Sequence, residues 1–311
     1  METHQLDIST PTGTTATPAA PLAAHARLGV TRLAVTDLAR SIPFYRDGLG
    51  LQHLGTDDGI ARMGVGDTTV LELEAAPDAR RPGRHAGLFH VALLYPSRLE
   101  LARVGKRLIE RGLQIDGASD HGSHEAFYLA DPDGNGLELA ADRPQELWPD
   151  PQVEYANGPQ PLDVRSLMDL VGDEPAPAQA AAGLVVGHLH LHVGDVDEAL
   201  AFYRDVVGFQ LMARLPSAAF VSVGGYHHHL GMNVWRGEGV PPAPDDAVGL
   251  RFWTVLVPSP ADITALAARL DAAAIEYDLI GDVHVAVRDP WNAELHVEVA
   301  PQVASRRSAS S

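Results

Sequence analysis

The segment VTDLARSIPFYRDGLG, residues 35–50, recurs as VGDVDEALAFYRDVVG at residues 193–208, which is 158 residues further along the chain. The turn Asp131-Pro132 recurs as Asp289-Pro290 at the same spacing. One spacing shared by two different motifs indicates a duplication. The sequence therefore predicts two related halves of equal length.

Each half divides again into two similar parts. In the first part, residues 28–35 alternate like a strand, Asp37 is suited to cap a helix, and residues 60–65 and 70–74 have strand patterns. The same order of strand, helix and strands returns in every quarter of the repeat. The leading strands are expected at residues 28–35, 88–95, 187–193 and 250–257. The pattern predicts an α+β fold of four βαβββ modules, numbered one to four along the chain.

The expected domain boundaries follow from these modules and from composition. The segments at both ends have a composition that favours loose structure. The segment between the halves is rich in Pro, Ala and Asp, and we expect it to contain one short helical piece near residues 164–171. We expect a disordered N-terminal tail at 1–26, a first two-module unit at 27–141, a linker at 142–186, a second unit at 187–300 and a loose tail at 301–311.

Composition excludes several classes of function. The chain has 311 residues, 45% hydrophobic residues and a formal net charge of -18, which argues against nucleic acid or an anionic membrane as a partner. It has no cysteine, so disulfides and thiolate chemistry are excluded, but it has 15 histidines. The N-terminal segment lacks the features of a secretory signal. We expect a cytoplasmic protein. The sequence does not predict its oligomeric state, and a homo-oligomer is one of the states left open.

The segment HGSHEAFYLADPDGNGLE, residues 121–138, combines polar side chains with strong turn chemistry. Residues 126–130 have the composition of a strand, and the DPDGNG run that follows favours a tight turn. The resulting hairpin would carry His121, Tyr128 and Glu138 at defined places. From these residues alone, a surface hairpin with incidental polar groups is an equally good interpretation. His124 is expected to be solvated.

The paired modules, with FYRD ending a first helix and D-P-x-G-N-G-x-E ending an even module, resemble the vicinal oxygen chelate superfamily. That superfamily includes glyoxalase I, bleomycin-resistance proteins and extradiol dioxygenases. Residues 121–138, together with GLFHVALLYPS (87–97) and GGYHHHLGMNVW (224–235), are most similar to its catechol-2,3-dioxygenase-like branch. Ser119 departs from the pattern of that branch. The resemblance implies an Fe(II)-dependent, or Mn(II)-dependent, enzyme of aromatic catabolism that opens a small aromatic diol with O2.

The resemblance also implies a metal centre. Its ligands would be His90 and His188, on the leading strands of modules two and three, and Glu138. Two histidines and one carboxylate suit non-haem Fe(II) and leave positions open for a diol and O2. The corresponding residues of modules one and four, Val30 and Phe252, cannot bind a metal. We therefore expect two half-barrels, one formed by modules two and three and the other by modules one and four. If the modules paired in another way, the metal would be held weakly, by His90, Glu138 and water alone.

Three further residues are expected to act on the substrate. The resemblance selects His228 from the run 227–229 as the acid and base, and alternation along a strand would separate it from its neighbours. His121 and Tyr128 would hydrogen-bond the substrate oxygens. The competing interpretations are an exposed histidine cluster and a core tyrosine.

Two other functions stay open at this point. A glyoxalase-like isomerase would bring a further carboxylate in place of a histidine, and Glu72 and Glu74 of module one are available only from the other half-barrel. A metal-free binding protein of the bleomycin-resistance type would sequester a ligand and would not need the three metal ligands together.

Overall fold

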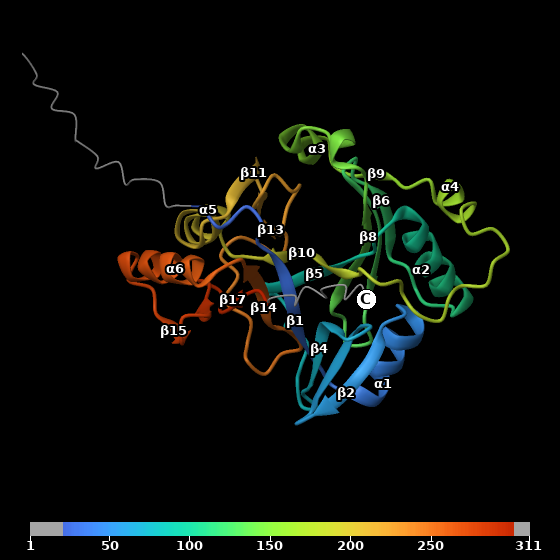
Figure 1. The fold of residues 1–311 in the computed structure, drawn as a ribbon, viewed down its shortest axis with the longest axis horizontal. Coiled ribbons are helices and arrows are strands. Elements are labelled where there is room, and N and C mark those ends of the chain that lie inside the picture. Colours follow the sequence, from blue (N-terminus) through green and yellow to red (C-terminus); the bar gives the residue numbers. More distant parts are fainter. Residues whose placement is uncertain (1–20, 302–311) are drawn as a thin grey trace, which may run out of the picture.

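The computed structural model describes residues 21–301, which form two mixed sheets (Figure 1). The first sheet has the order β15-β16-β17-β14-β1-β4-β3-β2. Its strands are β1 (Arg27–Val35), β2 (Gln52–Asp57), β3 (Ile60–Val65), β4 (Thr68–Ala75), β14 (Gly249–Val257), β15 (Tyr277–Ile280), β16 (His284–Arg288) and β17 (Glu294–Val299). The expected tails lie outside the described residues except for residues 21–26 and 301. Within that part Leu22 and Ala26 are buried, and Leu22 donates its N–H to the Gly208 carbonyl at 2.8 Å, so these two residues pack against the fold.

The second sheet has the order β11-β12-β13-β10-β5-β8-β7-β6-β9. Its strands are β5 (Gly87–Leu94), β6 (Gly117–Asp120), β7 (His124–Ala130), β8 (Gly136–Asp142), β9 (Gln160–Pro161), β10 (Val185–His192), β11 (Gln210–Leu215), β12 (Ala218–Ser222) and β13 (Leu230–Asn233). The first sheet thus joins modules one and four through β1 and β14, and the second joins modules two and three through β5 and β10. The predicted α+β fold and its crossed pairing are confirmed.

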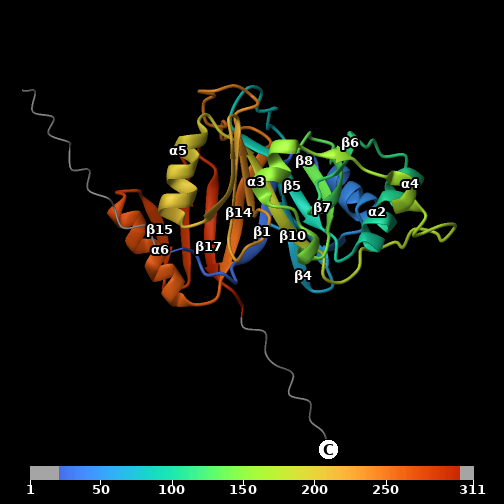
Figure 2. The ribbon, with the colours of Figure 1, turned by 90° about the horizontal axis from the view of Figure 1, so that it is seen from above.

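The helices pack against the outer parts of the two sheets. They are α1 (Leu38–Pro43), η1 (Phe44–Gly48), α2 (Arg98–Glu110), η2 (Gln145–Leu147), α3 (Pro151–Asn157), α4 (Val164–Met168), α5 (Val196–Leu200), η3 (Ala201–Val207) and α6 (Pro260–Ala272). Figure 2 shows α5 and α6 at one end of the molecule and α2 and α4 at the other, with β14, β1, β10 and β5 between them. Among the described helices, none has both the length and the apolar character needed to cross a membrane.

The two repeated motifs join the sheets to each other. The Tyr45 hydroxyl, in the π-helical turn η1 of module one, donates to Oδ2 of Asp131 in module two at 3.0 Å. The repeat copies this contact, because the Tyr203 hydroxyl donates to Oδ2 of Asp289 at 2.9 Å. All four residues are buried. FYRD and the Asp-Pro turn are therefore structural partners that connect modules belonging to different sheets.

We expect Tyr203→Phe to destabilise the protein more than Tyr45→Phe. Among the described residues, Oδ2 of Asp289 accepts a hydrogen bond only from Tyr203, whereas Oδ2 of Asp131 also accepts one from Asn135 at 2.9 Å. An unsatisfied buried acceptor costs about 1–3 kcal/mol, against about 1 kcal/mol for one lost bond of several. Thermal and urea unfolding of the two variants measure this difference, and equal losses would contradict it.

The same comparison has a definite pH dependence. Burial raises the pKa of Asp289 to about 6, and the Tyr203 hydroxyl stabilises the charged carboxylate. The stabilisation by Tyr203 is therefore smaller below pH 6, where Asp289 is protonated, and larger above it. The destabilisation by Tyr203→Phe should accordingly be greater at pH 8 than at pH 5.

Candidate metal centre

Three of the residues expected to bind a metal lie together in the second sheet. Glu138 on β8 is buried, and the Nε2 atoms of His90 on β5 and His188 on β10 each lie 3.0 Å from its Oε2. The strand register explains this arrangement, since Ala92 on β5 pairs with Glu138 on one side and with His188 on the other. The crossed pairing of modules two and three therefore brings the groups onto neighbouring strands.

His90 shows that this cluster suits a cation. Both of its ring nitrogens are buried, and neither makes a hydrogen bond within residues 21–301. Its Nε2 lies close to the Glu138 carboxylate but without the geometry of a hydrogen bond. A buried nitrogen lone pair directed at a carboxylate oxygen is unfavourable without a shared proton or cation. The donor set of two imidazoles and one carboxylate fits Fe(II) or Mn(II).

The charges around Glu138 keep it ionised. Burial by itself would raise the pKa of the carboxyl, but the imidazoles of His188, His124 and His90 hold it well below its usual range. Burial lowers the pKa of His188, although Glu138 opposes this effect. A charged carboxylate beside a neutral imidazole is the protonation state that metal ligands require.

His124 belongs to this centre, and the expectation that it is solvated is wrong. It is buried, and its Nε2 lies 3.0 Å from Oε1 of Glu138. The physical reason is that β7 begins at His124 and not at residue 126, so alternation places its side chain on the same face as Tyr128. Burial would lower the pKa of His124, but its hydrogen bond to Glu138 raises it.

His124 is better suited to orient the carboxylate than to bind the metal. Its Nδ1 is held by the Ser123 hydroxyl at 2.9 Å, and its Nε2 contacts the Glu138 oxygen that His90 and His188 leave free. His121, His124 and Glu138 form another group of potential metal ligands. Nε2 of His121 is less available to a metal, because it lies 2.6 Å from the Tyr128 hydroxyl. Such hydrogen bonds fix the orientation of metal ligands.

A cavity of about 400 Å³ opens beside this cluster. It is lined by Phe89, His90, Ser119, His121, His124, Tyr128, Glu138, Glu154, Tyr155, Gly158, Pro159, His188, His190, Leu215, Phe220, His228 and Trp235. His121, Tyr128 and His228, the three residues expected to act on a substrate, are among them. Ser119, which departs from the sequence pattern of the catechol-2,3-dioxygenase-like branch, also lines the cavity. Burial, with the neighbouring His124, lowers the pKa of His121 to about 3.

The run of three histidines is placed differently from the expectation. Strand β13 begins only at Leu230, so residues 227–229 precede it and strand alternation does not apply to them. His227 lies 3.2 Å from Asp142 and His229 contacts the Ser222 hydroxyl at 2.7 Å, and neither lines the cavity. The ring of His228 does line it, with its centroid 4.1 Å from that of His188.

The linker adds two side chains that sequence reasoning missed. Tyr155 of α3 places its hydroxyl 2.7 Å from Nδ1 of His228, and its ring stacks on Phe220 at 3.8 Å. Glu154 accepts a hydrogen bond from the Ser123 hydroxyl at 2.7 Å, and Ser123 in turn contacts His124. The pair Asp150-Pro151, an N-cap followed by proline, is the signal that predicts this helix. Helix α3 thus closes one side of the cavity.

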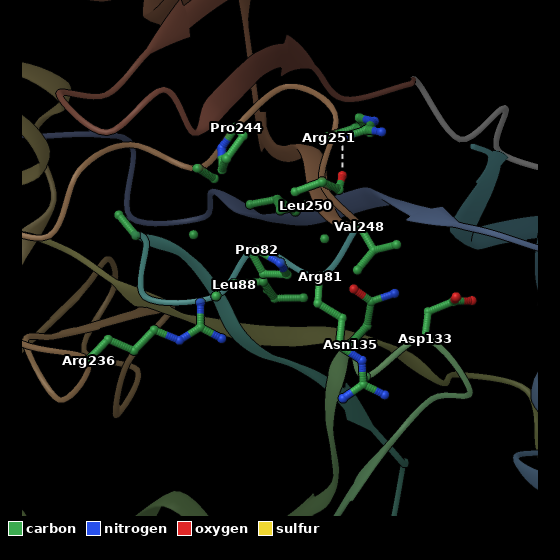
Figure 3. A pocket seen from close by; sticks show the side chains of 17 residues that line it. Arg81, Pro82, Leu88, Asp133, Asn135, Arg236, Pro244, Val248, Leu250 and Arg251 are labelled. Carbon is green, nitrogen blue, oxygen red and sulfur yellow. Dashed lines mark hydrogen bonds between the residues drawn. The ribbon is translucent and has the colours of Figure 1, made fainter. Parts of the chain in front are cut away.

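A second cavity, of about 250 Å³, lies where loops from both sheets meet (Figure 3). Arginines 81, 236 and 251 line it together with Asp133 and Asn135, and Arg251 donates to the Ala247 carbonyl at 2.9 Å. No histidine is among its described lining residues. It is therefore chemically distinct from the cavity beside Glu138.

Comparisons with known proteins agree with this architecture. A family model described as "Glyoxalase/Bleomycin resistance protein/Dioxygenase superfamily" matches residues 27–139 and 185–295. A Bacillus subtilis (strain 168) protein named catechol-2,3-dioxygenase is 41% identical over 252 residues, covering 79% of this chain and 88% of the relative.

Two solved structures have a similar fold. A putative dioxygenase from Bacillus subtilis subsp. subtilis str. 168 has a TM-score of 0.63 at 12% identity, covering 91% of this chain and 87% of that one. Glyoxalase I from Zea mays has a TM-score of 0.55 at 16% identity, covering 88% and 92%. At these identities the likeness concerns the fold alone.

Proposed function

Because the chain belongs to the glyoxalase, bleomycin-resistance protein and dioxygenase superfamily, we propose that it is an extradiol dioxygenase that opens a catechol-like diol with O2 and depends on Fe(II). The observation that carries the proposal is the convergence of His90 and His188 on one oxygen of the buried Glu138. These residues are at the edge of a cavity large enough for a small aromatic ring. The 41% identical relative, named as a catechol-2,3-dioxygenase, supports the same reaction.

His90, His188 and Glu138 would hold the iron, with Mn(II) as the alternative ion. When bound, the metal would bring the diol oxygens and O2 together on its remaining coordination positions. His124 would keep the Glu138 carboxylate in place through Oε1.

The proton-transfer groups act from the cavity walls. His228 would accept a proton from a substrate hydroxyl and hold it for return to the reacting oxygen atoms, since its ring faces the cavity beside His188. His121 and Tyr128, already joined at 2.6 Å, would hydrogen-bond the diol oxygens. Tyr155 would hold the His228 ring in position.

The walls of the cavity favour an aromatic substrate. Phe89, Phe220 and Trp235 supply apolar ring surfaces, and none of the described lining residues is Lys or Arg. Aromatic side chains stack well on another ring and exclude water. An isomerase of the glyoxalase type would need a further carboxylate at the site. Glu72 and Glu74 do not supply one, because they are on β4 of the other sheet and pair with Arg32 and Arg251.

The reaction is tested on anaerobically purified protein supplied with Fe(II). We expect about one iron per chain and, on mixing with catechol and O2, consumption of one O2 per catechol with formation of a yellow ring-opened product. Turnover of a thiol adduct without O2 would instead identify a glyoxalase-like isomerase. Ligand binding by a protein that retains no metal would identify a sequestering function.

A further inference from the structure

The first sheet carries a second group of potential metal ligands, far in sequence from Glu138. The repeat places His296 at the position of Glu138, and we expected that half-barrel to lack a site of the same kind. His284, His296 and Glu298 nevertheless have ligand atoms that all lie within 4.8 Å of one another. They lie on the neighbouring strands β16 and β17, where His284 pairs directly with Glu298.

The geometry of this group is already close to that of a bound ion. Nε2 of His284 and Nδ1 of His296 each lie 3.9 Å from Oε1 of Glu298. Ligands of a tetrahedral Zn²⁺ with bonds of about 2.0–2.1 Å are about 3.4 Å apart. The Glu298 side chain is 40% exposed, so a small rotation of it would close this difference.

The hydrogen bonds of the two imidazoles leave one ring nitrogen of each histidine available to a metal. Nε2 of His284 is buried and has no hydrogen-bond partner among the described residues. Nε2 of His296 lies 2.8 Å from Glu294, which leaves Nδ1 directed at the group. A histidine ligand usually donates its second N–H to a carboxylate in this way. The Phe252 ring, stacked on His296 at 4.2 Å and 8°, holds the imidazole in this orientation.

We propose that His284, His296 and Glu298 form a Zn²⁺ site in the first sheet, separate from the proposed iron centre. Two imidazole nitrogens, one carboxylate oxygen and one water complete the four-coordinate shell that Zn²⁺ prefers. The net charge of -18 favours a divalent cation near the surface. The site does not depend on the proposed dioxygenase activity.

The test is a Zn²⁺ titration of the metal-stripped full-length chain against a colorimetric chelator. The centre at Glu138 is expected to bind Zn²⁺ as well, because two imidazoles and a carboxylate are also zinc ligands. We therefore expect two equivalents for the unmodified chain, one each for His284→Ala and His188→Ala, and none for the double variant. Equal stoichiometry in His284→Ala and the unmodified chain overturns the proposal.

Two more conservative variants test the site even if His284→Ala does not fold. Glu298→Gln changes a partly exposed residue and should weaken the second equivalent at least tenfold. Glu294→Gln should weaken it by roughly 10–100-fold, because it changes a hydrogen-bond partner of the ligand His296 and not a ligand itself. His53→Ala, at an exposed histidine of the same sheet, should leave both equivalents unchanged. With Co²⁺ in place of Zn²⁺, the visible absorption of the second site should disappear in His284→Ala, and its persistence would also overturn the proposal.

Discussion

Glu138→Gln should leave the protein without iron after anaerobic purification, whereas His192→Gln should retain it. Within residues 21–301, Glu138 supplies the only carboxylate that contacts His90 and His188, so its loss removes the charge that balances the cation. His192 lies on the same strand as His188, but its Nδ1 contacts Asn233 at 2.8 Å, away from Glu138. Iron content per chain, measured with both changes made in a His284→Ala background, separates this centre from the proposed zinc site.

A series of histidine variants then distinguishes ligands from supporting residues. His90→Ala and His188→Ala should abolish stoichiometric iron, as Glu138→Gln does. His124→Asn should weaken iron binding by only roughly 10–100-fold, as expected for a residue that orients a ligand. If His188→Ala retained one iron per chain while His124→Asn lost it, the ligand set would be wrong. Unchanged thermal unfolding temperatures would show that the fold is intact.

His228→Gln should lower kcat by roughly 10²–10⁴-fold, the usual contribution of a general acid or base, while iron content stays near one per chain. The reason is positional: the His228 ring lines the cavity beside His188 and is held by Tyr155. His229→Gln is the matched control, because His229 contacts Ser222 outside the cavity. Steady-state kinetics with catechol and O2 measure both variants.

Tyr155→Phe separates the proton-transfer group from the residue that positions it. Loss of one hydrogen bond of about 0.5–1.5 kcal/mol should lower kcat by roughly twofold to tenfold. The effect should fall on kcat more than on KM, since the Tyr155 ring and its stacking on Phe220 remain. For the His228 prediction, full activity of His228→Gln, or equal losses in His228→Gln and His229→Gln, would show that another group transfers the proton.

Much of the fold was predictable because its signals are local or repeated. The spacing of 158 residues between paired motifs revealed the duplication, and helix caps such as Asp37 are local hydrogen bonds that the structure shows. The crossed pairing was predicted from the ligand positions that the family resemblance implies, since Val30 and Phe252 at those positions cannot bind a metal. That pairing places β10 beside β5, which pairs with β8 on its other side.

The site was predictable only in part. His124 was missed because its placement depends on where β7 begins, and strand ends are weakly encoded in a single sequence. Strand alternation could not predict how the side chains of residues 227–229 are oriented, because these residues come before β13. His228 nevertheless remains the residue proposed to transfer the proton. Tyr155 and Glu154 come from the linker, where composition indicated no role in the site.

The sequence alone therefore determined the four modules and the hairpin that carries Glu138, and it supplied the candidate metal ligands, because these depend on short-range patterns and side-chain chemistry. Only the tertiary structure decided which of the 15 histidines converge. That outcome depends on the register between strands from different halves of the chain, where Ala92 pairs with both Glu138 and His188. A shift of one residue in either pairing would turn the side chains to the opposite face of the sheet.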